Sequence, residues 1–384
     1  MSLVAVAAAL PLGIWLYLLL FRGRFWAPRE LAPAAQPAPA TVLAVVPARD
    51  EAATIGRAVQ SLLGQDLPVP LQVIVVDDGS TDGTAEAARA AAAAVGAAGR
   101  LTVLRGAPLQ PGWTGKLWAM SQGVAAAARF RPDYLLFTDA DIEHDRHTVA
   151  ALLGLVRERG LDMASLMVRL STATFAERCL IPAFVFFFLK LYPPRWIASA
   201  RSPVAAAAGG CILIRPAALA RAGGLAGIRG RIIDDCALAA AVKASGGSLR
   251  LALTSRSRSL RVYGTFGEIG AMISRTAFNQ LRHSWWLLGA TLLALALTYL
   301  APPLLACSRE PLAAGCAAAA WGLMTLCYLP MVRFYRVSPL YALLLPAVAL
   351  FYAAATVHSA VRFTLGRGGQ WKGRAQDVRA AGGG

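Results

Sequence analysis

Two acidic motifs, each directly after an apolar run, carry the clearest chemical signal in this sequence. Residues 73–76 lead into Asp77-Asp78-Gly79-Ser80, and residues 134–138 lead into Asp139-Ala140-Asp141. Short apolar runs bounded by Gly and Asp predict buried strands. Ligands of open α/β sheets bind outside the carboxyl ends of such strands, so we expect the four carboxylates to meet in one crevice. Carboxylates gathered there suit a hard cation that holds a phosphate.

The second motif has the spacing of a cation site. Asp139 and Asp141 can present two carboxylates to one Mg²⁺ or Mn²⁺, whose other positions accept diphosphate oxygens and water. Such an ion would neutralise charge that builds up on a diphosphate leaving group. The plainer interpretation is an Asp-rich turn that caps the next helix. His144 and His147 follow the motif, and for them we favour a solvated helix start over a metal role.

The first motif suits a nucleoside. Asp77 and Asp78 could bind a base or a ribose hydroxyl, and Gly79 would allow close backbone approach. The loop Pro47-Ala48-Arg49-Asp50-Glu51 follows the predicted strand 41–46 and would add a second contact through Asp50 or Glu51. Both loops could instead be Asx-type turns that lead into helices and bind nothing.

Three further segments have chemical potential. The loop Gly112-Trp113-Thr114-Gly115-Lys116 suits a fold over a phosphate, and lysine is scarce in this chain, although a surface turn is the simpler alternative. Gly209-Gly210 opens a predicted strand. Asp234-Asp235 precedes a predicted helix, where one carboxylate could take a proton from an attacking hydroxyl. The alternative for Asp234 is to cap that helix, and both roles can hold together.

Composition indicates a membrane protein with a substantial soluble part. Charged residues are 15% of the 384, against about 25% in an ordinary soluble protein. Hydrophobic residues are 57%, and the mean hydropathy is +0.53. The net charge of +17 favours Arg at a cytoplasmic membrane surface over nucleic-acid binding, because the Arg residues are dispersed. The six cysteines include no C-x-x-C pair, so we expect small buried hydrophobes.

The sequence predicts membrane segments near both ends of the chain. Residues 3–21 are long enough to span, and the charge lies after them, so we expect an anchor over 1–22 with its N-terminus outside. The rival interpretation is a cleavable signal peptide. A Pro/Ala-rich linker would follow over 23–40. Three apolar segments occupy 284–307, 312–332 and 339–361 within a C-terminal region 284–363, followed by a basic, Gly-rich tail over 364–384.

The C-terminal topology is ambiguous. Arg275 and Arg282 before the first segment, and Arg333 and Arg336 between the second and third, fit a cytoplasmic side. Three crossings would then leave the basic tail outside, against the rule. Either the last segment is re-entrant or the tail tolerates the wrong side.

Between the ends, residues 41–283 alternate strand-like and helix-like segments, which predicts an α/β domain in the cytoplasm. Expected strands cover 41–46, 71–76, 101–104 and 134–138, and expected helices cover 54–63, 84–95 and 117–128. Residues 179–194 are too short to span and too apolar for a surface loop. They predict either a buried core helix or a segment dipping into the headgroups.

In chain order, five of these motifs resemble the family 2 glycosyltransferases with the GT-A fold, a Rossmann-like nucleotide-diphospho-sugar transferase domain. The resemblance covers residues 41–265 and rests on Val46-Pro47-Ala48-Arg49-Asp50-Glu51, Asp77-Asp78-Gly79-Ser80, Asp139-Ala140-Asp141, Gly209-Gly210 and Asp234-Asp235. The 112–116 loop and the C-terminal spans are most similar to the membrane-bound, lipid-directed branch, particularly the hopene-associated glycosyltransferases. Ceramide and carotenoid glycosyltransferases are relatives of that branch.

The resemblance implies a nucleotide-sugar donor, a divalent cation and inversion at the anomeric carbon. Asp235 matches the catalytic base, and Asp139 and Asp141 match the metal ligands. Asp234 replaces a Glu of the family motif, which leaves its role less defined. The donor would contact Pro47, Arg49, Asp50, Glu51, Asp77, Asp78, Lys116, Asp139, Asp234 and either Arg275 or Arg282. The acceptor would contact Trp113, Gly209 and Gly210.

Besides Asp234, the sequence departs from the family pattern in the region before the C-terminal spans. Relatives often carry Q-x-x-R-W or R-x-x-R-W there, and residues 275–285 contain Gln, Arg and Trp but not at that spacing. This counts against a processive polysaccharide synthase. We therefore expect an inner-membrane, multi-pass enzyme that moves one sugar to a membrane lipid, by resemblance a hopanoid. The alternatives are a polyprenyl phosphate, ceramide or carotenoid acceptor, or a non-catalytic scaffold in lipid assembly.

Overall fold

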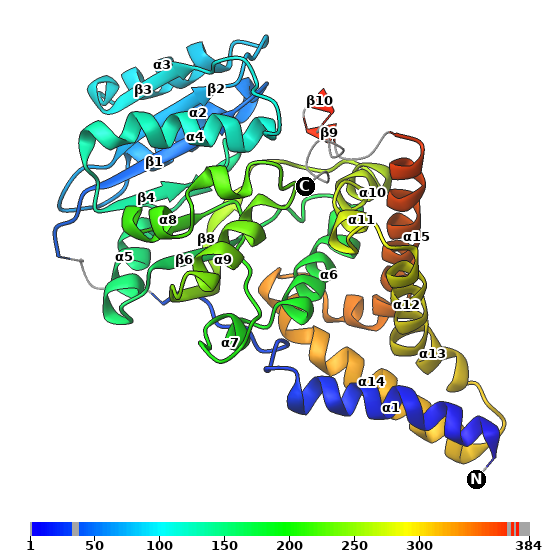
Figure 1. Cartoon of the computed structure of the whole chain (residues 1–384). Helices are drawn as coiled ribbons and strands as arrows, with labels where there is room; N and C mark the ends of the chain where they lie inside the picture. The colour runs from blue at the N-terminus through cyan, green and yellow to red at the C-terminus, as the bar shows by residue number, and fades with distance from the viewer. Residues whose placement is uncertain (1, 33–37, 367–369, 372–373, 376–384) are drawn as a thin grey trace. The chain divides into compact units, whose positions relative to one another are not determined.

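The chain folds into two compact units. The computed structural model describes residues 2–32, 38–366, 370–371 and 374–375. The first, here the sheet unit, contains Arg29–Leu170, Trp196–Arg261 and Gln370–Gly384. The second, here the helical unit, contains Met1–Pro28, Ser171–Arg195 and Val262–Gly369. Each unit is described by itself below (Figure 1).

An eight-stranded mixed sheet is the centre of the sheet unit, with strand order β3-β2-β1-β4-β7-β6-β8-β5. Its apolar runs are buried on both faces, as in β1, where every residue is buried. The predicted α/β architecture is confirmed, and the predicted strand bounds agree within two residues. The strands are β1 (Val42–Ala48), β2 (Gln72–Asp77), β3 (Leu101–Arg105), β4 (Tyr134–Phe137), β5 (Ile142–His144), β6 (Met163–Arg169), β7 (Ile212–Ile214) and β8 (Leu249–Ser259).

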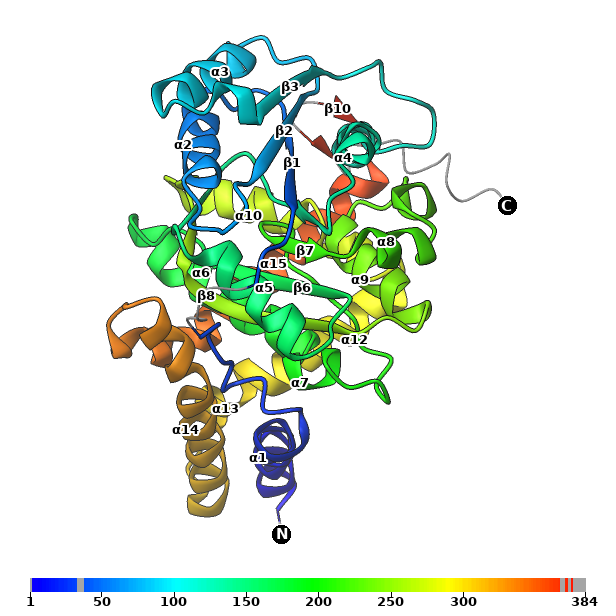
Figure 2. The same ribbon diagram turned by 90° about the vertical axis from the view of Figure 1, so that its left-hand side faces the viewer.

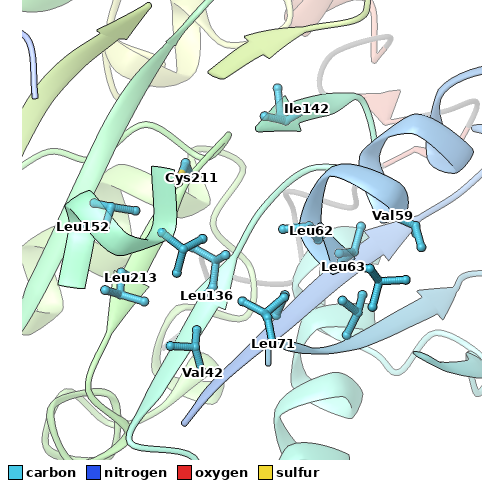
Figure 3. Close-up of a cluster of buried hydrophobic side chains, with 14 of the residues drawn as sticks. Val42, Val59, Leu62, Leu63, Leu71, Leu136, Ile142, Leu152, Cys211 and Leu213 are labelled. Atoms are coloured by element: carbon cyan, nitrogen blue, oxygen red, sulfur yellow. The ribbon is translucent and has the colours of Figure 1, made fainter. Parts of the chain in front are cut away.

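Helices cover both faces of this sheet. Side chains of α2, α3 and α5 share one buried core with β1, β2 and β4 (Figure 3). On the opposite face α4 approaches closely, because a Cβ at Gly123 would lie 2.4 Å from Val45 Cγ1 (Figure 2). The helices are α2 (Ala52–Leu63), α3 (Thr84–Ala94), α4 (Gly115–Ala127), α5 (Thr148–Glu158), α8 (Pro216–Arg221) and α9 (Asp234–Ala244), with α7 (Pro194–Ile197) where the chain enters the unit again.

Strand direction decides which loops share an edge. β2, β1 and β4 are parallel neighbours, so the loops after Ala48, Asp77 and Phe137 leave the sheet at one edge. β7 runs antiparallel to β4 and therefore starts at that edge. β6 is antiparallel to β7 and parallel to β8, so β8 ends there too. Before the sheet begins, Glu30 in the predicted linker bridges to Leu253 of β8.

Among the residues that the structure describes, the helical unit contains four helical segments long and apolar enough to cross a membrane. They are α1 (Leu3–Phe21), Trp285–Leu305, Pro311–Phe334 and Pro339–Thr364. The second consists of α12 (Trp285–Leu295), a π-helical turn (Ala296–Leu300) and α13 (Ala301–Leu305). The third is α14 (Pro311–Phe334), and the fourth joins a 3₁₀ turn (Pro339–Leu344) to α15 (Leu345–Thr364). The remaining helices are α6 (Phe175–Leu191), α10 (Phe266–Ser274) and α11 (Ala277–Gln280).

The phenylalanine-rich segment 179–194 lies mostly in α6. Thr174 and Glu177 form a capping box at its start. Phe186 is buried against Phe25 and Tyr328, with ring centroids 5.3 and 5.0 Å away. Phe187 packs on Tyr299 and Tyr352, at 5.5 and 4.9 Å, so two of the three consecutive phenylalanines pack against apolar helices of their own unit. Short strands β9 (Gln370–Trp371) and β10 (Arg374–Ala375) pair in the predicted tail, of which residues 367–369, 372–373 and 376–384 lie outside the described part of the chain.

Candidate active site

A lysine holds three aspartates together at the shared edge of the sheet. The Lys116 ammonium Nζ lies 2.9 Å from Asp139 Oδ1 and 3.2 Å from Asp234 Oδ2. Asp235 lies beside them, because a Cβ at Gly209 would meet both Lys116 Nζ, at 3.1 Å, and Asp235 Oδ2, at 3.4 Å. We call Lys116, Asp139, Asp234 and Asp235 the lysine cluster.

Different elements deliver these side chains. Thr114 caps α4 by accepting a hydrogen bond from the Leu117 amide, which places Lys116 in the first turn. Asp139 follows β4, and the aspartate pair opens α9, whose positive N-terminal end favours carboxylates. Gly209 precedes β7, which starts at this edge because it is antiparallel to β4. The reversal of β7 therefore brings a backbone segment to the cluster.

The charges of the cluster depend on one another. Burial alone would lower the pKa of Lys116, but the Asp139 and Asp234 carboxylates raise it above its usual range. Burial raises the pKa of Asp139, and the neighbouring Asp141 carboxylate adds to this, while Lys116 opposes it. Lys116 is therefore a permanent cation whose charge opposes the rise that burial causes in the pKa of Asp139.

Asp235 is held by main-chain donors. Its Oδ2 accepts a 2.8 Å hydrogen bond from the Gly209 amide, and its Oδ1 a 2.7 Å bond from the Cys236 amide. Burial, followed by the repulsion of Asp234, raises the pKa of Asp235 to about 6. The carboxylate is thus ionised at neutral pH yet far more basic than an exposed one, which suits proton abstraction.

Helix capping by Asp234 is a wrong prediction. Ile233 is the N-cap of α9, and no side chain caps it. Asp234 is the first helical residue, and its carboxylate pairs with Lys116 instead. Sequence spacing could not separate the two, because the N-cap and the next position differ by one residue.

The cluster lines a pocket with an apolar wall. Lys116, Asp139, Gly209, Asp234 and Asp235 form its polar side. The apolar side comes from β1, α4, β4, β7, α9 and the 3₁₀ turn Leu225–Ile228. Asp77 and Asp78 do not line this pocket, so the four carboxylates of the two motifs do not gather in it. The lining residues outside the polar side are Pro47, Leu117, Met120, Phe137, Thr138, Ile212, Leu225, Ile228 and Leu238.

Arg261 is a site residue that sequence reasoning missed. Its Nη2 lies 3.0 Å from Glu51 Oε1, and its Nε lies 3.3 Å from Asp141 Oδ2. Arg261 follows β8, which pairs with β5 directly after Asp141, so the sheet brings the two together. No motif marks this arginine. The available signal was its place just past a strand in which Arg256 and Arg258 alternate with small residues.

The aspartate pair has the chemistry of a partial cation site. Asp139 and Asp141 side chains are 34% and 16% exposed. Within the described residues no group of three or more His, Cys, Asp or Glu is arranged to hold a metal ion. Two carboxylates fit Mg²⁺ or Mn²⁺ only if substrate phosphates and water complete the shell, which is how such ions often bind.

The loops after β1 and β2 are tied to each other. Asp50 Oδ1 accepts from the Thr81 amide at 2.9 Å, and the Asp50 amide donates to Ser80 Oγ at 3.0 Å. Arg49 donates to the Asp78 carbonyl and lies 3.9 Å from its buried carboxylate. We call residues 48–52 and 77–84 the paired loops.

Asp77 closes the turn after β2 with its side chain. Its Oδ1 accepts a 2.9 Å hydrogen bond from the amide of Ser80, three residues on, and the two-residue bond of an Asx turn is made by Asp82, which accepts from the Thr84 amide at 3.1 Å. Glu51 also anchors its loop, since its amide donates to Thr84 Oγ1 at 2.8 Å. The turn interpretation is therefore correct in geometry, and a nucleoside role for these acids stays a prediction.

Other predicted residues lie elsewhere. Trp113 packs on Trp118, with ring centroids 5.3 Å apart, and does not line the pocket. Gly210 faces Val168 and Ile142 in the core. Arg275 and Arg282 belong to the helical unit, so their place at the diphosphate stays a prediction.

A solvated helix start is wrong for His144. It lies in β5, is 4% exposed, and its ring bonds to Thr138 Oγ1 at 2.9 Å and Ser257 Oγ at 2.8 Å. Burial lowers its pKa to about 4, so the ring is neutral. His147 is half-exposed and precedes α5, as the solvated alternative expects.

Comparisons with known proteins agree with this architecture. Two 4,4'-diaponeurosporenoate glycosyltransferases of Staphylococcus aureus are similar over short stretches. That of strain bovine RF122 / ET3-1 is 40% identical over 98 residues, 26% of this chain and 23% of the relative. That of strain MRSA252 is 39% identical over 121 residues, 30% of this chain and 29% of the relative. The chain thus spans less than a third of these relatives.

A solved structure shares the fold across nearly the whole chain. It is a mannosyltransferase from Pyrobaculum calidifontis in complex with GDP-Man and Mn²⁺, with a TM-score of 0.57 and 20% identity, and the match covers 94% of this chain and 99% of that one. Residues 43–221 match the model of Glycosyl transferase family 2. Residues 43–221 are therefore similar to a family 2 glycosyltransferase domain, and the chain has a GT-A-like fold.

Proposed function

We propose that this chain is an inverting glycosyltransferase that moves one sugar from a nucleotide-diphosphate sugar to a membrane lipid. The observation that carries the proposal is the lysine cluster, in which one cation joins Asp139 and Asp234 beside the basic carboxylate of Asp235. A family 2 domain over residues 43–221 supports the same reaction class.

Lys116 would stabilise the departing diphosphate. Its ammonium has three donors, of which two point to carboxylates in the cluster, and it remains charged throughout. Asp139 and Asp141 would hold a divalent cation, Mg²⁺ or Mn²⁺, which supplies further positive charge to the leaving group. Asp234 would keep Lys116 in place, and the paired loops would hold the nucleoside.

Asp235 would act as the base. Its carboxylate would take the proton of an acceptor hydroxyl as that oxygen attacks the anomeric carbon from the side opposite the diphosphate. The Gly209 and Cys236 amides fix both carboxylate oxygens, so the acceptor must approach the free lone pairs. Gly209 has no side chain to obstruct this approach.

The membrane segments favour a lipid acceptor. Within the described residues, four helical segments are long and apolar enough to span, and Arg residues flank all four. We infer an inner-membrane location with the sheet unit on the cytoplasmic side, where nucleotide sugars are available. The resemblance to hopene-associated enzymes makes a hopanoid the first candidate acceptor.

The Staphylococcus relatives favour a second candidate, a carotenoid-type acid. The name of those relatives describes a carboxylate acceptor. A carboxylate is already ionised at pH 7, with an ordinary pKa near 4, and needs no base. The two acceptors therefore make different demands on Asp235.

The test is product analysis by mass spectrometry. Membranes containing the full chain are incubated with Mn²⁺, one of several nucleotide sugars, and either a hopanoid alcohol or a polyene acid. We expect a lipid mass increase of one hexose with a single donor. With the alcohol, Asp235→Asn is expected to lower the rate about 10²- to 10⁴-fold. With the acid, the same variant would lose far less.

Glu86→Gln is the matched control. Glu86 is exposed on α3 and pairs only loosely with Arg89, at 3.5 Å, so its neutralisation should leave the rate unchanged. If Asp235→Asn and Asp139→Asn both release nucleotide at the wild-type rate, the catalytic proposal is wrong. The chain would then be better described as a membrane scaffold.

A further inference from the structure

We propose that the segment Pro339–Thr364 does not cross the membrane but lies along one leaflet, with both ends on the side of the Arg333–Arg336 turn. This rests on the proposed membrane location of the helical unit. Its length and apolar character would allow a crossing, so composition alone does not distinguish the two arrangements. Contacts within the helical unit distinguish the two arrangements.

Contacts between the spanning helices define their two ends. At one end, Ser2 bonds to Glu310, and Ala8 packs with Ala313, Ala317 and Leu305. The starts of α1 and α14 and the end of the Trp285–Leu305 segment therefore lie together. We call this the distal end.

The opposite end is marked by α6. Arg22, just after α1, donates to the Lys190 carbonyl at 3.1 Å. Tyr328 of α14 packs on Phe186, as does Phe25. α1 and α14 thus run in the same direction and finish at this end, which we call the proximal end (Figure 1).

The start of Pro339–Thr364 lies at the proximal end. Only four residues separate it from Phe334, the last residue of α14. Seven residues into α15, the Tyr352 hydroxyl donates to the Leu180 carbonyl of α6 at 3.0 Å, and its ring lies 4.9 Å from Phe187.

The C-terminal end of Pro339–Thr364 also lies on the proximal side. A crossing helix of this length would bring residue 363 to the distal end, about 30 Å from its start. Instead Phe363 stacks on His283 at 4.0 Å, two residues before the Trp285–Leu305 segment begins. Ser274 Oγ donates to the Ala355 carbonyl at 3.0 Å, and the Phe278 amide donates to Ser359 Oγ at 3.0 Å. α15 therefore runs beside α10 and α11, which precede the span.

The free face of the segment fits a bilayer interface. Leu343, Leu350, Val357 and Val361 recur at helical spacing and are 37–56% exposed. Trp285 and Trp286, at the level of Phe278 and Phe363, are 54% and 91% exposed, as in the aromatic belts at membrane surfaces. The occupant of this face is the lipid leaflet, with Arg336 and Arg362 beside anionic headgroups.

The arrangement also resolves the charge conflict in the sequence. With Pro339–Thr364 lying in one leaflet, the basic residues after it stay on the same side as Arg282, Arg333 and Arg336. All of these then obey the positive-inside rule. A crossing would place the tail alone on the opposite side.

Reporter fusions test the side of each end in the full chain. Green fluorescent protein and alkaline phosphatase are inserted separately after residues 308, 338 and 366. We expect fluorescence after 338 and 366 and phosphatase activity after 308. Opposite reporters at 338 and 366 would overturn the inference. If 338 and 366 agree but both report the outside, the inferred cytoplasmic location is wrong and the leaflet inference stands.

A depth measurement provides a second, independent reading. Spin labels are placed at Leu350→Cys, Val357→Cys and Val361→Cys in a chain whose native cysteines are replaced, in lipid vesicles. Because α15 runs antiparallel beside α12 and the π-helical turn, a segment confined to one leaflet places residue 361 no deeper than residue 350. A crossing helix places residue 361 about 16 Å deeper than residue 350, toward the distal end, which would contradict the proposal.

Discussion

The paired loops and the lysine cluster are both rich in aspartate, and both leave the same edge of the sheet, yet they use their carboxylates differently. In the paired loops, Asp50 and Asp77 accept backbone amides of Thr81 and Ser80. In the lysine cluster, carboxylates face one another across a single ammonium. Neutral donors build a rigid loop, whereas burial and repulsion between carboxylates raise the pKa values of Asp139 and Asp235 and create reactivity. An acidic motif alone does not tell these cases apart.

The largest expected effect is on turnover when the central cation is removed. Lys116→Met leaves Asp139 and Asp234 without their partner and removes charge from the diphosphate. We expect the rate of nucleotide release to fall about 10²- to 10³-fold. Lys243→Met is the matched control, because Lys243 only donates to carbonyls of Trp196, Ile197 and Val204. An equal loss in the control, per folded molecule, would contradict the assigned role.

The next effect separates the two aspartate motifs by their need for a cation. Asp139→Asn should raise the Mn²⁺ concentration for half-maximal activity about tenfold or more, because one of two carboxylate ligands is lost. Asp77→Asn should leave that concentration unchanged, since its carboxylate serves a turn. Titration of Mn²⁺ into chelator-treated enzyme measures this concentration for both variants. If it rose in Asp77→Asn and not in Asp139→Asn, the cation would belong to the first acidic motif instead of the second.

A pH profile sharpens the distinction through Asp235. The pKa of this proposed base is raised to about 6, so activity on a hydroxyl acceptor should fall about tenfold per unit as pH drops below 6. In Asp234→Asn a repulsive charge disappears, so the pKa of Asp235 falls and the acid limb moves to lower pH. Burial is the larger cause of the raised value, so part of the rise remains. An acid limb that moves upward in this variant would show that Asp235 is not the titrating group.

The smallest effect is on stability. Asp77→Ala removes the acceptor of the Ser80 amide and should cost about 1 kcal/mol of unfolding free energy. Asp234→Asn should cost less, because losing the ion pair with Lys116 is offset by relief of repulsion with Asp235. Thermal unfolding in detergent measures both variants, and Glu86→Gln again provides the baseline. If Asp234→Asn lost more unfolding free energy than Asp77→Ala, the lysine cluster rather than the paired loops would be the more important for stability.

Sequence reasoning found the strands because runs such as 73–76 are buried on both faces and have no polar alternation to confuse them. It found Lys116 and Asp235 because scarce or paired residues sit beside glycines. It missed Arg261, whose role depends on β8 pairing with β5, a contact between segments more than 100 residues apart. It misplaced His144 because β5 has only three residues, and so short a strand shows no recognisable alternation of polar and apolar residues.

The antiparallel direction of β7 has a consequence for how such an enzyme can diversify. Because β7 begins at the reactive edge, Asp235 is aligned by the peptide unit at Gly209 rather than by a neighbouring side chain. Residues around the pocket can therefore change to suit another acceptor while the base keeps its orientation. Position 209 itself is the exception, since any side chain there would meet the ammonium at 3.1 Å. The alignment of the proposed base thus follows from the strand order, and on this proposal the choice of acceptor is free to vary around it.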